Sequence, residues 1–130
     1  GWCVGALPER KSSLSRPLND LERFKDQNQR WRNKINYELQ TSYKKIFKLI
    51  DFLIFLKVPS FKYVYKWRAL QEKKLKKNSK GKKIMSKKQV KEFVMFYERL
   101  TRNMLKSLDA KSDLTLNLNT NHCFKSIKIN

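Results

Sequence analysis

The feature that most constrains this chain is a change of hydrophobic period near its middle. Residues 29–50 repeat apolar side chains every three or four positions, as the apolar stripe of a helix does. The next segment, Phe52–Leu56, is continuously apolar and stops before Pro59. A short run without alternation is typical of a strand that is covered on both faces, as in a parallel sheet. The change from helix to buried strand predicts an α/β fold.

The second half of the chain continues this order of elements. Ser86 and Gln89 have capping-box spacing, which predicts that a long helix starts there and runs to about Leu108. Two strand candidates follow at 114–118 and 124–129, with a turn between them. Strands that alternate with helices indicate a mainly parallel sheet flanked by helices.

A helix is also expected at 61–77, with Ser60 as its cap. The lysine-rich segment 73–85 has no apolar stripe, and we expect a mobile basic loop over it. In α/β folds, ligands bind beyond the carboxyl ends of the strands. The segments that meet this condition are Gly1–Ala6, Val58–Ser60 and Asn119–His122.

The net charge limits the choice of partners. The 130 residues include 31 Lys and Arg against 11 Asp and Glu, which gives a formal net charge of +20. Such a charge attracts nucleic acid, anionic membranes or phosphorylated metabolites. A solvated lysine-rich surface without a dedicated partner is the alternative interpretation. Nucleic acid is the less favoured partner, because the aromatic residues fall mainly on core stripes.

Cysteine usage and glycine content exclude several kinds of site. Cys3 and Cys123 are isolated, and His122 is the single histidine, so a zinc site is not expected. Two isolated cysteines fit a reduced, cytoplasmic protein. The apolar run at 49–56 is far too short to cross a bilayer. With three glycines in the chain, no GxxxxGK[ST] phosphate loop is present.

The helix at 61–77 contains the candidates for chemistry on phosphate. Arg68 and Glu72 are four residues apart and can form a surface ion pair of about 0.3–0.5 kcal/mol. In a functional interpretation, Arg68 and Lys74 neutralise the charge of a transferring phosphoryl group, and Glu72 or Gln71 orients them. The sequence leaves both interpretations open.

The first five residues, Gly1–Gly5, resemble interior sequence rather than a loose terminus. They predict that the chain is the C-terminal part of a larger domain. Other groups of residues follow them along the whole chain. These are Pro17–Glu22 with Trp31-Arg32; Pro59–Phe61 with Trp67-Arg68, Gln71-Glu72 and Leu75; Met85-Ser86 with Val90, Phe93-Val94 and Tyr97–Arg102; and Leu116–Asn119 before His122.

In their order and spacing, these segments resemble the C-terminal half of the P-loop kinases typified by D-glycerate 3-kinase, which are related to the phosphoribulokinase and uridine kinase group. The resemblance implies that residues 1–130 form the C-terminal part of one P-loop kinase domain. It implies a basic lid and an activity that uses ATP and Mg²⁺ to phosphorylate a small hydroxylated acid or sugar. The family's phosphate loop and its magnesium-holding acidic residue lie upstream of Gly1. This chain alone is therefore expected to be inactive and to need a separate N-terminal half.

The resemblance also implies roles for particular positions. The lid residues Arg68, Glu72 and Lys74 are the catalytic candidates. Around the adenine the candidates are Asn119, His122 and Arg102. Beside the acceptor substrate they are Gly1, Trp2 and Tyr97. No residue of this chain is expected to bind the metal.

Overall fold

Helix α6 (Lys87–Ser107) lies at the centre of the molecule in the computed structural model, which describes residues 1–78 and 84–130. The Ser86 hydroxyl accepts a hydrogen bond from the Gln89 backbone N–H, and the Gln89 side chain accepts one from the Ser86 N–H. This confirms the predicted capping box. The helix ends at Ser107 with Leu108 as its C-cap, which agrees with the predicted end at about Leu108. Ala6, Leu39, Phe55, Met104 and Leu108 form the buried cluster against which the other elements pack.

The sheet has three strands: β1 (Ile54–Lys57), β2 (Leu114–Leu118) and β3 (Phe124–Ile129). Their order is β1-β2-β3, with β1 parallel and β3 antiparallel to β2. The mixed α/β class is confirmed. A mainly parallel sheet is not, because the described strands form one parallel and one antiparallel pair.

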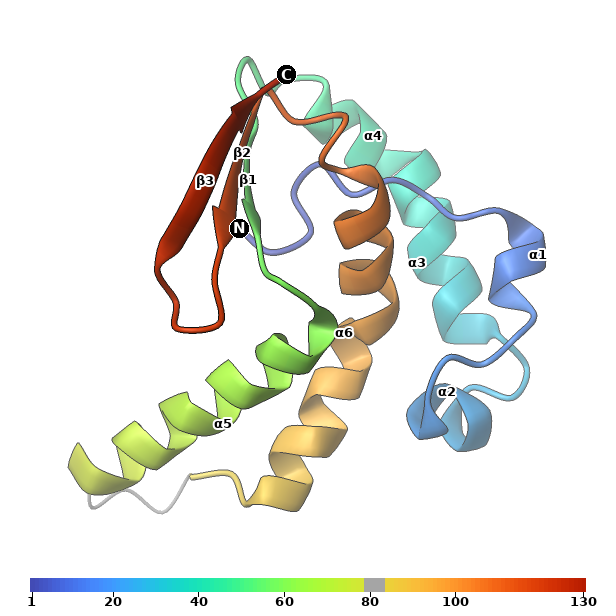
Figure 1. Ribbon diagram of the computed structural model, residues 1–130. Coiled ribbons are helices and arrows are strands. Elements are labelled where there is room, and N and C mark those ends of the chain that lie inside the picture. The colour runs from blue at the N-terminus through green and yellow to red at the C-terminus, as the bar shows by residue number, and fades with distance from the viewer. Residues whose placement is uncertain (79–83) are drawn as a thin grey trace.

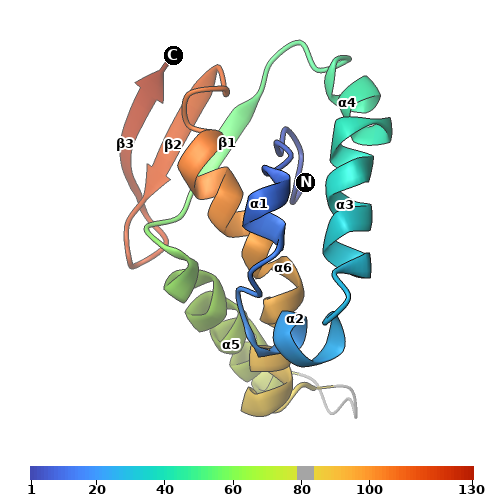
Figure 2. The ribbon, with the colours of Figure 1, turned by 90° about the vertical axis from the view of Figure 1, so that its right-hand side faces the viewer.

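The prediction that Phe52–Leu56 is covered on both faces is wrong. Phe55 is buried against the core, but Phe52, Ile54 and Leu56 are exposed. The reason is visible in Figures 1 and 2: α6 covers one face of the sheet, while no described element covers the other. The apolar run therefore marks a strand whose second face has no layer against it.

The predicted helix at 29–50 is two helices, α3 (Arg30–Gln40) and α4 (Ser42–Phe47). Thr41 separates them with φ −115° and ψ −88°, and its hydroxyl donates to the Tyr37 carbonyl oxygen at 2.9 Å. A hydroxyl that bonds back to the preceding turn competes with the regular helix. The apolar period continued through this break, so periodicity alone did not reveal it.

Two short helices, α1 (Lys11–Leu14) and α2 (Asp20–Lys25), precede α3. Figure 2 shows the N-terminal segment passing between α6 and α3, so that the layers are the sheet, α6 with this segment, and α3. Helix α5 (Phe61–Asn78) extends from the carboxyl end of β1 and packs on α6.

Part of the predicted basic loop at 73–85 is helical, because α5 continues to Asn78. Residues 79–83 of that loop lie outside the described residues. Of the helices in the described ranges, none combines the length and the apolar character that a membrane span requires.

Candidate functional site

The N-terminal segment reaches the centre of the molecule through a tight turn. Cys3 and Gly5 both have left-handed backbone conformations, with φ of 69° and 76°. A Cβ atom on Gly5 would lie 2.7 Å from a methyl carbon of Leu53 and 3.2 Å from one of Leu108. Glycine therefore allows both the positive φ and the close approach to the core. Residues 2–5 are in a turn conformation.

This turn places Trp2 against α6. The Trp2 indole Nε1 donates to the Thr101 hydroxyl oxygen at 3.1 Å. The Trp2 ring meets the ring of Tyr97 edge to face, with centroids 4.7 Å apart. The structure thus brings together Trp2 and Tyr97, two of the predicted acceptor-side residues.

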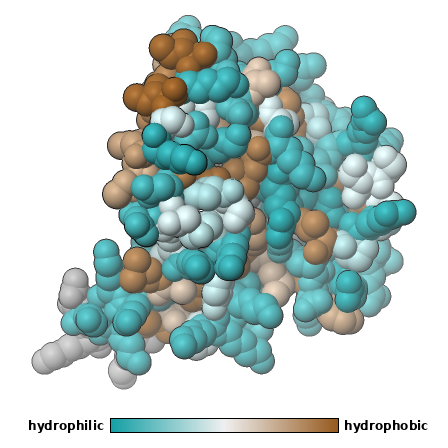
Figure 3. Space-filling view, viewed as in Figure 1, coloured by the Kyte–Doolittle hydropathy of each residue, from teal (hydrophilic) through white to brown (hydrophobic). Residues whose placement is uncertain are grey.

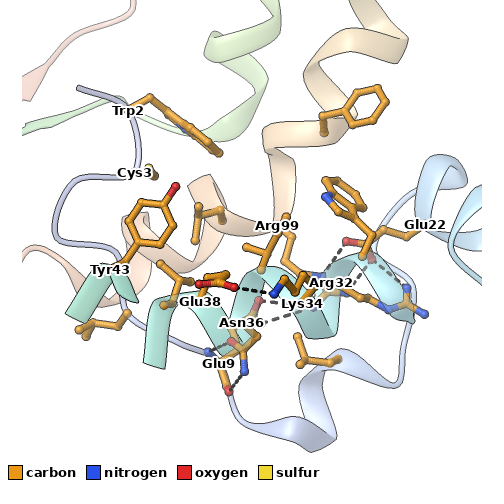
Figure 4. A pocket seen from close by; sticks show the side chains of 17 residues that line it. Trp2, Cys3, Glu9, Glu22, Arg32, Lys34, Asn36, Glu38, Tyr43 and Arg99 are labelled. Atoms are coloured by element: carbon orange, nitrogen blue, oxygen red, sulfur yellow. Dashed lines mark hydrogen bonds and ion pairs between the residues drawn. The ribbon is translucent and has the colours of Figure 1, made fainter. Parts of the chain in front are cut away.

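A pocket of about 240 Å³ lies between the N-terminal segment, α3 and α6 (Figure 4). Its walls are mainly apolar and include two tryptophans and a phenylalanine. These wall residues are Trp2, Leu7, Leu14, Trp31, Ile35, Leu39, Phe96 and Leu100. Charged groups also line it, and their pairing decides which ligands the pocket can accept.

The central charged pair joins Arg99 of α6 to Glu22 of α2. Arg99 Nε and Nη2 donate to the two carboxylate oxygens of Glu22, each at 2.7 Å. Arg99 also donates to the backbone oxygens of Ser13 and Arg16 and contacts Glu9 at 3.5 Å. A bidentate guanidinium–carboxylate pair of this kind is strong and geometrically specific. Through these contacts, the Arg99 side chain connects Glu9, Ser13, Arg16 and Glu22 to α6.

A second guanidinium, that of Arg32, lies behind Glu22. Arg32 Nη1 donates to Glu22 Oε2 at 3.3 Å, and Arg32 Nε lies 3.6 Å from Asp26. The Asp26 carboxylate also accepts from the backbone N–H groups of Trp31 and Arg32, and so caps the start of α3. Arg32, Asp26 and Glu22 are all buried.

The electrostatics of Glu22 follow from this geometry. Burial alone would raise the pKa of its carboxyl group. The hydrogen bonds from Arg99 and from the Leu18 N–H, with the charges of Arg99 and Arg32, outweigh that effect and lower the pKa. The same hydrogen bond with Glu22 raises the pKa of Arg99. We therefore expect Glu22 and Arg99 to be ionised at neutral pH.

Both arginine side chains that line the pocket are paired with carboxylates. Two guanidinium groups, those of Arg32 and Arg99, face the carboxylates of Glu9, Glu22 and Asp26. At the rim, Lys34 pairs with Glu38 at 2.7 Å. The interior of this pocket therefore suits an apolar group better than an anionic hydroxy acid.

The carboxyl ends of β1 and β2 form a second candidate region. Because the two strands are parallel, Val58–Pro59 and Asn119–Thr120 lie at the same edge, where they line an open hollow with Lys57. The sequence predicted ligand contacts at both segments, and the structure places them side by side.

An aromatic pair lies next to this edge. The His122 ring lies 4.0 Å from the ring of Trp67, centroid to centroid, and the two are inclined at 55°. A shallow hollow here is lined by Tyr63, Lys66 and Leu70 of α5 with Thr120 and Asn121 of the turn. Flat rings beside a lysine are the groups that a nucleotide base and its phosphates contact in many sites.

The predicted lid residues share α5. Arg68 Nη2 lies 2.6 Å from Glu72 Oε1, and Arg68 Nη1 donates to Gln71 at 2.8 Å. Glu72 also accepts from the Met85 backbone N–H at 3.0 Å. These contacts serve the packing of α5 against the start of α6. Lys74 is exposed on the same helix.

The predicted adenine-side residues do not all meet. The Asn119 side-chain oxygen accepts from the backbone N–H groups of Asn121 and Cys123, so it shapes the turn that presents His122. Arg102 pairs with Glu98 at 2.8 Å, and its guanidinium lies 5.1 Å from the centre of the Phe61 ring. Arg102 thus lies at the α5–α6 junction and lines neither hollow of the strand-end region.

Within 1–78 and 84–130, no three side chains of His, Cys, Asp or Glu cluster in a way that could hold a metal ion. Mg²⁺ prefers oxygen ligands such as carboxylates. Mg²⁺ that accompanies ATP usually takes one or two protein carboxylates and completes its shell with phosphates and water, so such a site needs no larger cluster.

Sequence reasoning missed the buried network. The Arg99 guanidinium pairs with Glu22, which is 77 residues away in the chain. The spacing of Asn19 and Glu22 was the available signal: Asn19 caps α2, and Glu22 reaches back to the Leu18 N–H at 2.7 Å. Spacing along one helix does not reveal partners that are so distant in sequence.

Comparisons with known proteins give one structural likeness to report. The whole chain superposes on D-glycerate 3-kinase from Cryptococcus neoformans with a TM-score of 0.77, at 19% sequence identity. This chain spans 48% of that protein's chain. No protein-family model and no curated protein matches the sequence. The likeness shows a fold shared with part of that kinase.

Proposed function

We propose that this chain forms the acceptor- and base-side part of a small-molecule kinase that transfers a phosphoryl group from ATP to a small hydroxylated acid or sugar. The observation that carries the proposal is the superposition of all of the chain on D-glycerate 3-kinase. ATP and the acceptor are the ligands, and the Mg²⁺ ligands and the phosphate loop come from another segment.

Within this proposal the residues of the chain position ligands. The rings of Trp67 and His122 stack beside the adenine, and the strand ends at 58–60 and 119–122 hold its edge. Lys66 and Lys74 of α5 attract the phosphates, while Arg68 is held in place by Glu72. Trp2 and Tyr97 border the acceptor on the outer side of the N-terminal turn. Phosphoryl transfer depends on such positioning and on charge stabilisation.

Nucleotide titration followed by amide NMR tests the base-side assignment. ATP should shift the amides of residues 119–123 and the indole of Trp67, and tripolyphosphate should not. Loss of one stacking ring costs about 1–3 kcal/mol. His122→Ala should therefore weaken ATP binding by about 5-fold or more, whereas Phe124→Ala, which removes an exposed ring that lines neither hollow, should change it little. If ATP and tripolyphosphate shift the same amides equally, the assignment is wrong.

The purified chain should not phosphorylate glycerate with ATP. The reason is that neither a phosphate loop nor a metal-ligating cluster is found among its described residues. Detection of glycerate phosphate above a no-enzyme control would contradict this expectation.

Binding to nucleic acid is the second candidate function. Helix α5 extends away from the sheet (Figure 1) and carries the exposed residues Lys62, Lys66, Lys73, Lys74, Lys76 and Lys77. A real nucleic-acid interface should lose affinity steeply with salt, in proportion to the phosphates contacted. Binding no tighter than that of a lysine-rich control protein would exclude this function.

A further inference from the structure

The face of the sheet opposite α6 is a continuous apolar surface. The register aligns Ile54 with Leu114 and Ile129, and Leu56 with Leu116 and Ile127, so these side chains share one face. On the edge strands, their exposed fractions run from 51% at Ile54 to 81% at Ile129. Figure 3 shows apolar side chains on the sheet side of the molecule, at the upper left of that view.

This face continues around the free edge of β1 into a hollow of about 560 Å³. Strand β1 pairs with β2 on one side, and within the described residues no strand pairs with its other side. The hollow is lined by Gly1, Trp2, Phe52, Leu56 and Leu108, among others, and no lining residue has a charged side chain. In a chain of net charge +20, this surface therefore lacks the groups that would attract a polyanion.

An apolar face beside a free strand edge indicates what kind of partner can bind there. Soluble proteins rarely leave a large contiguous apolar patch uncovered, and a free strand edge readily pairs with another strand. An α/β sheet is normally covered on both faces. Here the likeness to D-glycerate 3-kinase uses 100% of this chain but 48% of that protein, so about half of the kinase has no counterpart in this chain.

We propose that the free edge of β1, the hollow beside it and the uncovered sheet face bind the phosphate-loop-bearing half of a kinase domain. That half adds an apolar strand to β1 and covers the far face of the sheet with helices. This interface rests on the proposed kinase function and names the partner that the site needs. Its formation requires neither nucleotide nor acceptor.

Co-expression tests the interface directly. The probe is the part of the Cryptococcus neoformans kinase without a counterpart here, carrying an affinity tag. The wild-type chain should co-purify with it at a ratio of one to one. Ile54→Lys with Leu56→Lys should reduce the recovered chain by at least about tenfold, because the ammonium groups would be buried without partners. Phe24→Lys, at an exposed aromatic residue of α2, is the matched control and should not reduce it.

Lysine is a residue that natural edge strands carry, so the double variant should keep its fold, as its far-ultraviolet circular dichroism can show. If the tagged half is insoluble by itself, the wild-type chain should raise its soluble yield and the double variant should not. The proposal is overturned if wild type neither co-purifies nor solubilises the half, or if the double variant behaves like wild type. It is also overturned if the lysines abolish only a homodimer of this chain. ATP shifts at 119–123 without association would reject the interface and leave the proposed function standing.

Discussion

The Glu22 side chain is buried to 1% exposure, while the side chain of Ile129 on β3 is 81% exposed. Charged side chains are therefore buried where α2, α3 and α6 meet, whereas apolar side chains are exposed along the sheet. In the first region, named here the ionic core (Glu9, Glu22, Asp26, Arg32 and Arg99), the guanidinium groups have carboxylate partners. In the second, the sheet face, no described element packs against the apolar side chains.

The difference shows which part of the fold is complete in itself. The ionic core draws its partners from α2, α3, α6 and the N-terminal segment, so each of its two guanidinium groups faces carboxylates of the described chain. The apolar side chains of the sheet face remain in water and contribute little to stability. Covering them would stabilise the covered state by roughly 25 cal/mol per Å² of apolar area removed from water. Substitutions in the ionic core and the adjoining apolar cluster should therefore change the free energy of unfolding. Substitutions on the sheet face should instead change the binding of a partner.

The largest expected effect comes from breaking the ionic core. Glu22→Gln leaves the guanidinium groups of Arg32 and Arg99 buried with one fewer carboxylate. Removing one partner of a buried ion pair costs about 3–5 kcal/mol. Urea unfolding followed by circular dichroism should show a loss of this size in the free energy of unfolding.

Asp20→Asn is the matched control for that change, because it also neutralises an acidic residue of α2. The Asp20 carboxylate is mostly exposed and lies 3.9 Å from Arg23. Exposed pairs contribute about 0–1 kcal/mol, so this variant should stay near wild type. Equal losses in the two variants would show that the ionic core is not a special source of stability.

The second effect compares one substitution in two environments. Leu108→Ala removes a side chain that is 1% exposed and contacts the core, and it should lower the free energy of unfolding by about 2–5 kcal/mol. Leu56 on the sheet face is 56% exposed, so Leu56→Ala should cost less than about 1 kcal/mol. A comparable cost at Leu56 in urea unfolding would mean that the sheet face is already covered, for instance by a second copy of the chain.

The third effect is the pH dependence of the ionic core. In the folded chain the pKa of Glu22 lies below its ordinary value of 4.5, because Arg99 and the Leu18 N–H bind the ionised form. The stabilisation is therefore complete above that ordinary value and is lost as the pH falls through the lower, folded pKa. The slope from one such proton is at most about 1.4 kcal/mol per pH unit.

Asp109 and Glu38 also have lowered pKa values, through Lys57 and Lys34, so they contribute to the same acid-side loss. The difference between wild type and Glu22→Gln isolates the part that belongs to Glu22. Urea midpoints measured between pH 3 and pH 7 should converge for the two proteins as the pH falls. Parallel curves would exclude a pKa shift at Glu22.

Local patterns predicted the elements that depend on near neighbours. The capping box at Ser86, the long apolar stripe of α6 and the alternation of Leu114, Leu116 and Leu118 are all short-range signals, and the structure confirms them. The break at Thr41 was missed because the apolar stripe continues on both sides of it. The uncovered face of β1 was missed because an apolar run shows only that both faces of a strand can be buried. It does not show whether another element packs against each face.

The candidate site was predictable to a smaller extent. Parallel pairing explains why the segments at 58–60 and 119–122 meet, and the helical spacing explains the Arg68–Glu72 pair. The contact of Trp2 with Tyr97 and the pair of Glu22 with Arg99 join residues that are 95 and 77 positions apart. Such contacts depend on how whole elements pack, which no local spacing encodes.

The smallest effect tests whether the two regions unfold together. Ser86→Ala removes the hydroxyl that caps α6, and the loss of an N-cap costs about 1 kcal/mol. Helix α6 contributes Arg99 to the ionic core and Met104 to the cluster beneath the sheet. If the domain is one cooperative unit, amide hydrogen exchange at Leu39 of α3 and at Thr115 of β2 should lose the same protection. A loss confined to α6 and α3 would show instead that the sheet opens independently, which is the behaviour expected of a region that is completed only when its apolar face is covered.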